Sequence, residues 1–229
     1  MTKGNTYPMD LIESPFDIPV PEEYRELAER VVVPGPELER YETYHAAQIS
    51  DRFQEGPYDT LVLVPLLNGA RNFAKGVSGR ISLPSKLMGF RVSSYGSGTE
   101  SDGSIKIYPE GVFDLLDELG KHSEPMLVIL EDIVDSGHTF DRLQRPWERR
   151  DQIFYPGGEP ASEDLIGALA SLNGYEPLFS ALLSKPGRRE LEVRIDYLGF
   201  IIPNLWVNGY GLDTDGEFRD GDCVWEMKV

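Results

Sequence analysis

The sequence contains little cysteine, histidine or positive charge, and it has no long apolar run. Its single cysteine, Cys223, cannot form a disulfide within the chain, and we expect a small buried hydrophobe there, not a nucleophile. The three histidines, His45, His122 and His138, lack the spacing of metal ligands. No run approaches the roughly 18 apolar residues that span a bilayer, and the first residues do not resemble a secretory signal. We therefore expect a cytoplasmic protein with no membrane partner.

The balance of charge is strongly acidic. The chain has 22 lysine and arginine residues against 39 aspartate and glutamate residues, which gives a net charge of −17. Such a surface repels nucleic acid and anionic membranes at long range, so no nucleic-acid partner is expected. It also repels phosphorylated small molecules, so any phosphate site has to be built locally from backbone amides, a few cations and a metal ion.

The order of apolar and polar segments predicts an α/β fold. The 229 residues, 40% hydrophobic and 27% charged, suit one packed domain. Continuous apolar runs at 59–67 and 125–130 predict strands buried on both faces. Further strands are expected at 89–95, 104–108, 176–185 and 195–202, and helical segments at 35–56, 71–81, 111–124, 135–147 and 163–175. This alternation predicts a mostly parallel central sheet flanked by helices.

Three carboxylates stand where the second buried strand should end. Glu131 and Asp132 directly follow the run 125–130, and Asp135 precedes the small-residue turn 136–139. In a parallel sheet, ligands bind at the carboxyl ends of the strands. Carboxylates suit hydroxyls or Mg²⁺, and the amides of a turn that opens a helix suit phosphate. A sugar phosphate needs this combination; the alternative is a solvated acidic loop that caps a helix.

The stretch VILEDIVDSGHTF resembles the phosphoribosyl-pyrophosphate (PRPP) signature of the type I phosphoribosyltransferases, and later motifs resemble their 6-oxopurine (hypoxanthine-guanine) branch. The proline-rich, polar residues 1–20 predict an irregular arm, and the three prolines, two glycines and mixed charge of 144–163 predict an inserted excursion. The resemblance implies a single domain over 21–229. It also implies a small hood formed by segments near 21–40 and 200–229. A short helix is expected to follow Pro21.

The resemblance assigns roles to the residues of this signature. Glu131 and Asp132 would bind the ribose hydroxyls directly or through Mg²⁺, the expected cofactor. Asp135 would lie near purine N7 as the general base. The 5′-phosphate would be held by Asp135, Ser136, Gly137, His138 and Thr139.

Two loops resemble the pyrophosphate loop and the flexible catalytic loop of the family. PLLNGA resembles the short pyrophosphate loop, with a cis peptide at Leu67-Asn68 and contacts from Asn68 and Gly69. Family members commonly have lysine where this chain has Asn68, so this position loses a charge but keeps a side-chain donor. The segment that begins at Ser94 and Tyr95 resembles the flexible loop that closes over the reaction and excludes water.

Motifs near the C-terminus resemble the base-binding part of the 6-oxopurine branch. Lys185 would donate to the exocyclic O6 of the purine and would oppose adenine, whose exocyclic group is itself a donor. Trp206 would stack on the base, and the backbone of Val207 would read its pyrimidine edge. Asp213 would reach Mg²⁺ and the base 2-position, so the expected metal ligands are Glu131, Asp132 and Asp213. Arg219 would contact pyrophosphate.

The resemblance implies Mg²⁺-dependent transfer of 5-phosphoribosyl from PRPP to hypoxanthine or guanine in purine salvage, by a homo-dimer or homo-tetramer. Other interpretations stay open. One is a transferase specific for xanthine or a modified purine. Another is a non-catalytic regulator that binds PRPP. A third, an isoprenoid-type enzyme, would place its acidic residues on helices, whereas here they follow a strand.

Overall fold

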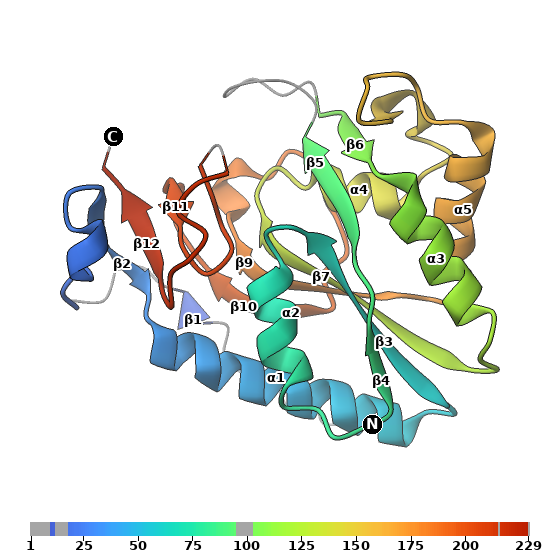
Figure 1. Cartoon of the computed structure of the whole chain (residues 1–229), viewed down its shortest axis with the longest axis horizontal. Helices are drawn as coiled ribbons and strands as arrows, with labels where there is room; N and C mark the ends of the chain where they lie inside the picture. The colour runs from blue at the N-terminus through green and yellow to red at the C-terminus, as the bar shows by residue number, and fades with distance from the viewer. Residues whose placement is uncertain (1–9, 12–17, 95–102, 215, 229) are drawn as a thin grey trace.

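The computed structural model describes residues 10–11, 18–94, 103–214 and 216–228 (Figure 1). Tyr95 lies outside the described residues. The strands are β1 (Asp10–Leu11), β2 (Ala28–Val33), β3 (Thr60–Leu67), β4 (Ser85–Leu87), β5 (Phe90–Ser94), β6 (Ile105–Ile107), β7 (Pro125–Val134), β8 (Ile153–Phe154), β9 (Leu178–Ser184), β10 (Tyr197–Ile201), β11 (Val207–Asn208) and β12 (Val224–Met227). The helices are α1 (Gly35–Glu55), α2 (Arg71–Ser78), α3 (Pro109–Leu119), α4 (His138–Gln144) and α5 (Glu163–Asn173), with 3-10 turns η1 (Glu22–Tyr24), η2 (Arg150–Gln152) and η3 (Pro186–Arg188).

The central sheet is mostly parallel. Its strand order is β1-β10-β9-β7-β3-β5-β6-β8, with β4 paired to β3 off this path. All its neighbouring pairs are parallel except β5 and β6. The two continuous apolar runs of the sequence form β3 and β7, which pair at the centre of the sheet, where the register places Pro65 opposite Leu130. The predicted fold class is confirmed.

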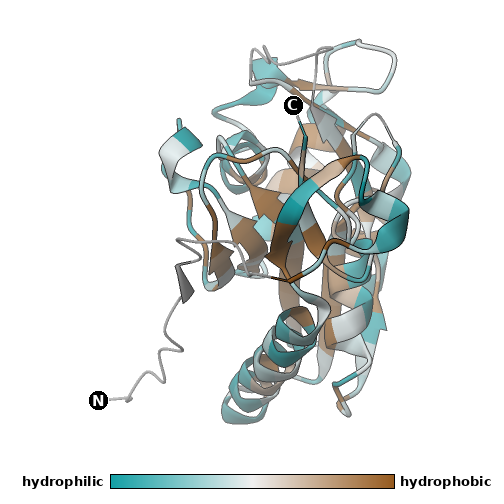
Figure 2. Cartoon of the chain, turned by 90° about the vertical axis from the view of Figure 1, so that its left-hand side faces the viewer, coloured by the Kyte–Doolittle hydropathy of each residue, from teal (hydrophilic) through white to brown (hydrophobic). Residues whose placement is uncertain are grey.

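Helices cover both faces of this sheet, and each face carries a hydrophobic core. On one face, α1 and α2 bury residues such as Leu38 and Phe73. On the other face, α3, α4 and α5 bury Leu115, Phe140 and Leu169. Figure 2 shows the hydrophobic residues concentrated on the central strands and the hydrophilic residues on the outer turns of the helices. A strand buried on both sides needs no alternation of polar residues, which is why β3 and β7 are apolar almost throughout.

A second, antiparallel sheet joins the two ends of the described chain. Its order is β11-β12-β2, so residues near 30 pair with residues near 225. The Tyr24 and Trp225 rings stack with their centroids 5.3 Å apart. Cys223 is buried beside them, and burial raises the pKa of its thiol to about 11. The burial of Cys223 agrees with the expected small buried hydrophobe. The small antiparallel sheet corresponds to the small hood of the predicted fold class.

Two segments differ from the sequence-based expectation, and the sequence predicts no elements for a third, the excursion at 144–163. The short helix after Pro21 is only the 3-10 turn η1, because the chain is drawn into the small sheet from Ala28 onward. The arm at 1–20 was expected to be irregular, but β1 pairs with β10 at the edge of the central sheet. The excursion at 144–163 supplies η2 and β8, and β8 extends the same sheet beside β6. No described helix is both long enough and apolar enough to cross a membrane.

The buried histidine of α1 makes folding sensitive to acid. His45 is fully buried against the rings of Tyr41, Phe73 and Tyr197, and its Nε2 shares a 2.8 Å hydrogen bond with Ser180 Oγ. Burial lowers the pKa of His45 from 6.5 to about 3. Below about pH 6.5 the unfolded chain therefore binds a proton that the folded chain does not, and the contribution of His45 to stability falls as the pH falls.

We predict that His45→Gln removes this sensitivity. We compare the free energy of unfolding of the variant with that of wild type. When the pH is lowered from about 7.5 to about 5, this difference should shift by about 2 kcal/mol in favour of the variant. Urea unfolding of both proteins at both pH values measures this change. Glu42, whose pKa burial raises to about 7, shifts stability in the opposite sense, so the comparison is made between the two proteins at each pH. A difference that is constant with pH would contradict the prediction.

Candidate active site

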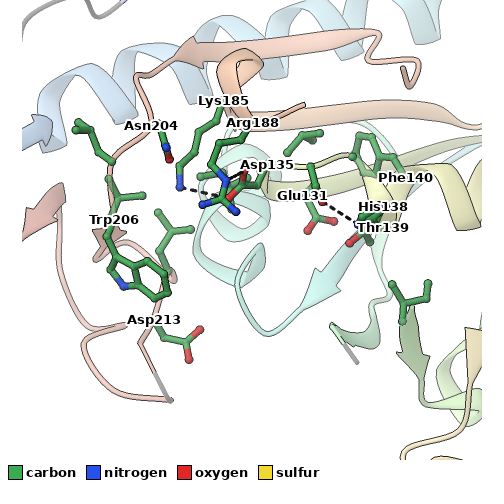
Figure 3. A pocket seen from close by; sticks show the side chains of 18 of the residues that line it. Glu131, Asp135, His138, Thr139, Phe140, Lys185, Arg188, Asn204, Trp206 and Asp213 are labelled. Atoms are coloured by element: carbon green, nitrogen blue, oxygen red, sulfur yellow. Dashed lines mark hydrogen bonds and ion pairs between the residues drawn. The ribbon is translucent and has the colours of Figure 1, made fainter. Parts of the chain in front are cut away.

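A cavity of about 410 Å³ opens at the carboxyl ends of β7 and β9 (Figure 3). Its walls come from β7, the turn 135–139, the segment after β9, residues 204–207 and residues 212–213. In Figure 3, Trp206 and Asp213 lie on one side of this cavity and His138 and Thr139 on the other, with Asp135 and Glu131 between them. Segments about 70 residues apart in the sequence therefore face one another across a single cavity.

Glu131 places a carboxylate on the cavity wall near the end of β7. Its Oε2 atom is buried and has no hydrogen-bond partner among the described residues. Burial, and next to it the charge of Asp132, raises the pKa of Glu131 well above 4.5. A buried carboxylate oxygen without a partner is costly, and a bound hydroxyl or cation would offset this cost.

Asp132 lies against the loop that follows β3. A Cβ atom on Gly69 would stand 1.8 Å from Asp132 Oδ2, so only glycine fits there without movement of the carboxylate. The Leu67-Asn68 peptide bond in this loop is cis, as the resemblance implies. Burial raises the pKa of Asp132 to about 6, although hydrogen bonds from backbone amides and the nearby Arg219 favour the charged form.

Asp135 is held between two cations. Arg188 Nε lies 3.0 Å from one of its carboxylate oxygens, and Lys185 Nζ lies 3.5 Å from the other. The lysine is 7% exposed and stands inside the cavity. Burial lowers the pKa of Lys185, whereas the neighbouring Asp135 raises it. This pairing keeps an otherwise costly buried ammonium close to a carboxylate.

The turn 135–139 is bound to the segment that follows η3. Gly137 has φ +94°, a conformation that glycine adopts without strain, and a Cβ there would stand 2.7 Å from the Leu191 carbonyl oxygen. The amides of Glu190 and Leu191 both donate to the Ser136 carbonyl. Ser136 Oγ lies 3.1 Å from His138 Nδ1, and His138 Nε2 lies 3.4 Å from Glu190. The turn is therefore fixed on one side by backbone hydrogen bonds, and it presents the small side chains of Ser136 and Thr139 and the ring of His138 to the cavity.

The far wall carries the aromatic and acidic residues expected from the C-terminal motifs. Trp206 is 47% exposed at the cavity, and its Nε1 donates to Thr214 Oγ1 at 2.8 Å. Val207 is buried at the cavity wall. Asp213 forms an ion pair with Arg219 at 2.6 Å, and Arg219 also donates to the Gly211 carbonyl.

The carboxylates can hold a metal ion only together with other oxygen ligands. Among the described residues, no group of three or more His, Cys, Asp or Glu side chains could hold a metal by itself. Asp132 lies close enough to Asp213 for the charge of Asp213 to raise its pKa. Glu131 adds a third carboxylate at the cavity wall. Mg²⁺ commonly uses one or two carboxylates and completes its shell with substrate oxygens and water. The donor set, with the unpartnered oxygen of Glu131, fits such shared binding.

The structure brings most of the expected site residues together. The cavity wall includes Glu131, Asp135, Ser136, Gly137, His138, Thr139, Lys185, Trp206, Val207 and Asp213. Four expected site residues, Asn68, Gly69, Asp132 and Arg219, do not line this cavity. Gly69 stands against Asp132, and Arg219 pairs with Asp213, which does line it. Ser94 ends β5 immediately before the residues that are not described.

Sequence reasoning missed three polar residues of the cavity, Ser104, Arg188 and Asn204. A signal for Arg188 was present, because SKPGRR places it three residues after Lys185, at the end of a buried strand. Nothing in the sequence around Asn204 distinguishes it from an ordinary loop residue, since its place depends on how the small sheet folds over the cavity.

Comparison with known proteins identifies the family, although no family model matches the chain. The hypoxanthine phosphoribosyltransferase of Haemophilus influenzae is 34% identical over 174 residues, which covers 76% of this chain and 81% of that protein. The hypoxanthine-guanine phosphoribosyltransferase of Mycobacterium avium is also 34% identical, over 176 residues, covering 76% of this chain and 72% of that protein.

Solved structures agree in fold. A hypoxanthine phosphoribosyltransferase from Staphylococcus aureus has a TM-score of 0.65 and 21% identity, covering 92% of this chain and 97% of that chain. The hypoxanthine phosphoribosyltransferase of Trypanosoma cruzi, solved with the product IMP, has a TM-score of 0.64 and 22% identity, covering 92% and 98%. With the signature residues gathered at one cavity and 34% identical relatives matched over most of their length, the chain belongs to the hypoxanthine-guanine branch of the type I phosphoribosyltransferases.

Proposed function

We propose that this protein transfers the 5-phosphoribosyl group of PRPP to N9 of a 6-oxopurine, hypoxanthine or guanine, with release of pyrophosphate and formation of IMP or GMP. The bond from ribose C1 to the pyrophosphate oxygen breaks, and the bond from C1 to N9 forms. The proposal extends what the named relatives do to the residues of this chain.

The observation that carries this proposal is the order of groups across the cavity. Trp206 and Lys185 suit a purine that accepts a hydrogen bond at O6. The turn at 136–139, with the hydroxyls of Ser136 and Thr139, suits the 5′-phosphate at the other side. Glu131 lies between them, where the ribose of a nucleotide would lie (Figure 3). Base, sugar and phosphate sites thus follow one another in the order in which a nucleotide connects them.

Asp135 is the proposed general base. As N9 bonds to C1, the purine gives up the proton on N7, and a carboxylate between base and phosphate sites is placed to accept it. Arg188, the closer of the two cations at 3.0 Å, remains paired with Asp135 in this scheme. Lys185, at 3.5 Å, is then available to donate to O6. A donor at this position favours 6-oxopurines over adenine, whose 6-amino group would meet the ammonium unfavourably.

The pyrophosphate is proposed to leave toward Asn68, Gly69 and Arg219. Mg²⁺, when bound by Glu131, Asp132 and Asp213 with oxygens of PRPP, supplies positive charge that stabilises the leaving group. Arg219 pairs with Asp213 in the structure, so its guanidinium lies beside the proposed metal site. Asn68 offers a neutral side-chain donor, and its Oδ1 accepts from Arg71 at 3.3 Å, which brings a further cation to the loop. We also propose a homo-dimer or homo-tetramer as the working form.

A panel of nucleobases tests the proposal. With PRPP and Mg²⁺, we expect hypoxanthine and guanine to yield nucleotides and adenine to react at least about 100-fold less efficiently in kcat/KM, because adenine leaves Lys185 without an acceptor. Chromatographic detection of the nucleotide and of pyrophosphate measures the reaction. Preference for xanthine would favour the dioxopurine alternative. Binding of PRPP without turnover of any base would favour the regulator, and absence of both would refute the proposal.

Asp135→Asn tests the assignment of the general base. The variant keeps the size of the side chain but removes the proton acceptor, so kcat should fall by about 100-fold or more. The dissociation constant of PRPP, measured by calorimetry, should change little. Asp114→Asn, on the exposed face of α3, is the matched control and should behave as wild type. An unchanged kcat for Asp135→Asn would remove Asp135 from the mechanism.

Gly69→Ala tests the contact between the pyrophosphate loop and Asp132. The added Cβ would stand 1.8 Å from Asp132 Oδ2 and must displace either the loop or the carboxylate. A displacement of about 1 Å at a reacting site can cost about 100-fold, and we expect a loss of this order in kcat/KM. Gly167→Ala, whose Cβ would lie 3.9 Å from its nearest neighbour, should retain full activity. Equal activity of the two variants would contradict the proposed role of this loop.

A further inference from the structure

The excursion 144–163 lies next to the proposed phosphate site but has no role in the reaction described above. None of its residues lines the cavity, but it contacts segments that do, in two places. Its strand β8 pairs in parallel with β6, where Ile153 lies opposite Ile105. Ile105 and the preceding Ser104 both line the cavity. The excursion therefore supports the strand that forms one wall of the cavity beside the turn 135–139.

The second connection is a buried charge cluster centred on Asp141 of α4. The Asp141 carboxylate is completely buried and pairs with the guanidinium groups of Arg142, Arg145 and Arg149. The distances to Arg142 and Arg149 are both 2.8 Å. Arg142 belongs to α4, whereas Arg145, directly after the end of α4, and Arg149 lie in the excursion. We call Asp141, Arg142, Arg145 and Arg149 the Asp141 cluster.

The Asp141 cluster is connected directly to the phosphate turn. The Asp141 amide donates to the Gly137 carbonyl at 3.0 Å, so the central carboxylate sits one helical turn after the middle of the phosphate turn. Arg142 Nη2 and His138 Nε2 both lie within 3.0 Å of the point where a Cβ on Gly103 would stand. A guanidinium of the cluster thus reaches the same wall as the His138 ring, which lines the cavity.

The cluster also connects to the segment that holds the turn from its other side. Arg145 donates to the Glu192 carbonyl at 3.4 Å. The neighbouring Glu190 and Leu191 amides donate to the Ser136 carbonyl. Three segments therefore surround the turn: α4, residues 189–192 and the start of β6. The Asp141 cluster includes residues of α4 and contacts residues 189–192, and β8 of the excursion pairs with β6.

We propose that the excursion 144–163 is part of the PRPP site, in which Arg149 acts as a positioning residue that fixes the phosphate turn through Asp141. This inference rests on the proposed function, because it concerns the 5′-phosphate of the proposed substrate. Loss of the Arg149 contact leaves Asp141 paired with Arg142 and Arg145, but it removes the ion pair that ties residue 149 of the excursion to α4, so the segments on either side of this ion pair can shift. Here the segments free to rearrange are those that hold the phosphate turn.

Arg149→Gln tests the inference and Arg150→Gln is its matched control. Arg149 is half-buried, so its substitution is compatible with folding, whereas Arg150 is the adjacent exposed arginine of the same excursion. In Arg149→Gln, we expect the dissociation constant and the KM of PRPP to rise roughly tenfold. The kcat at saturation and the KM of the purine should stay within about twofold of wild type. Arg149→Lys, which keeps a positive charge, should recover part of the loss.

Calorimetric titration with PRPP and Mg²⁺ and steady-state kinetics separate the outcomes. An Arg149→Gln variant that binds PRPP as wild type does would overturn the inference and leave the proposed function standing. Equal losses for PRPP and purine, or equal losses in the Arg150→Gln control, would indicate general loosening of the fold and would also overturn it. Wild-type protein that does not bind PRPP would refute the proposed function itself.

Discussion

The parallel pairing of β7 with β3 on one side and β9 on the other is the constraint on which the candidate site depends. Because the three strands run in the same direction, the residues that follow each of them emerge at one edge of the sheet. The register places Val134 opposite Ser184, so the acidic end of β7 stands beside Lys185. The loop that starts at Asn68 follows β3 at the same edge. One hydrogen-bond pattern thus gathers the carboxylates, the ammonium and the pyrophosphate loop.

The acidic composition of the chain disfavours binding of an anion, and ion pairs at the site reduce this repulsion. A chain with a net charge of −17 must bind a highly anionic proposed substrate, and the cavity itself contains Glu131, Asp135 and Asp213. Two of these three carboxylates are paired with cations. Arg188 and Lys185 pair with Asp135, and Arg219 pairs with Asp213. Glu131 is the exception, and its unpartnered oxygen supports the proposal that this position shares a metal ion with the substrate.

The proposed phosphate turn illustrates how a small motif depends on distant segments. Gly137 supplies the backbone conformation, but backbone donors from residues 190 and 191 hold its neighbour Ser136 in place. Asp141 then anchors the helix behind the turn to an arginine from the excursion. Under the role proposed for Arg149, residues 144–163 influence binding of the phosphate although none of them lines the cavity.

The sequence by itself determined the central strands, the α/β class and the position of the acidic signature, because apolar run length and the Ser136-Gly137 turn are local properties. It also indicated Lys185 and Trp206 through their motifs. Only the tertiary structure decided that Arg188 pairs with Asp135, that Asp132 packs on Gly69, and that β8 joins β6. These contacts join segments far apart in the chain, and no local pattern encodes such pairings. They arise only when the strands align in register and bring their ends to a common edge.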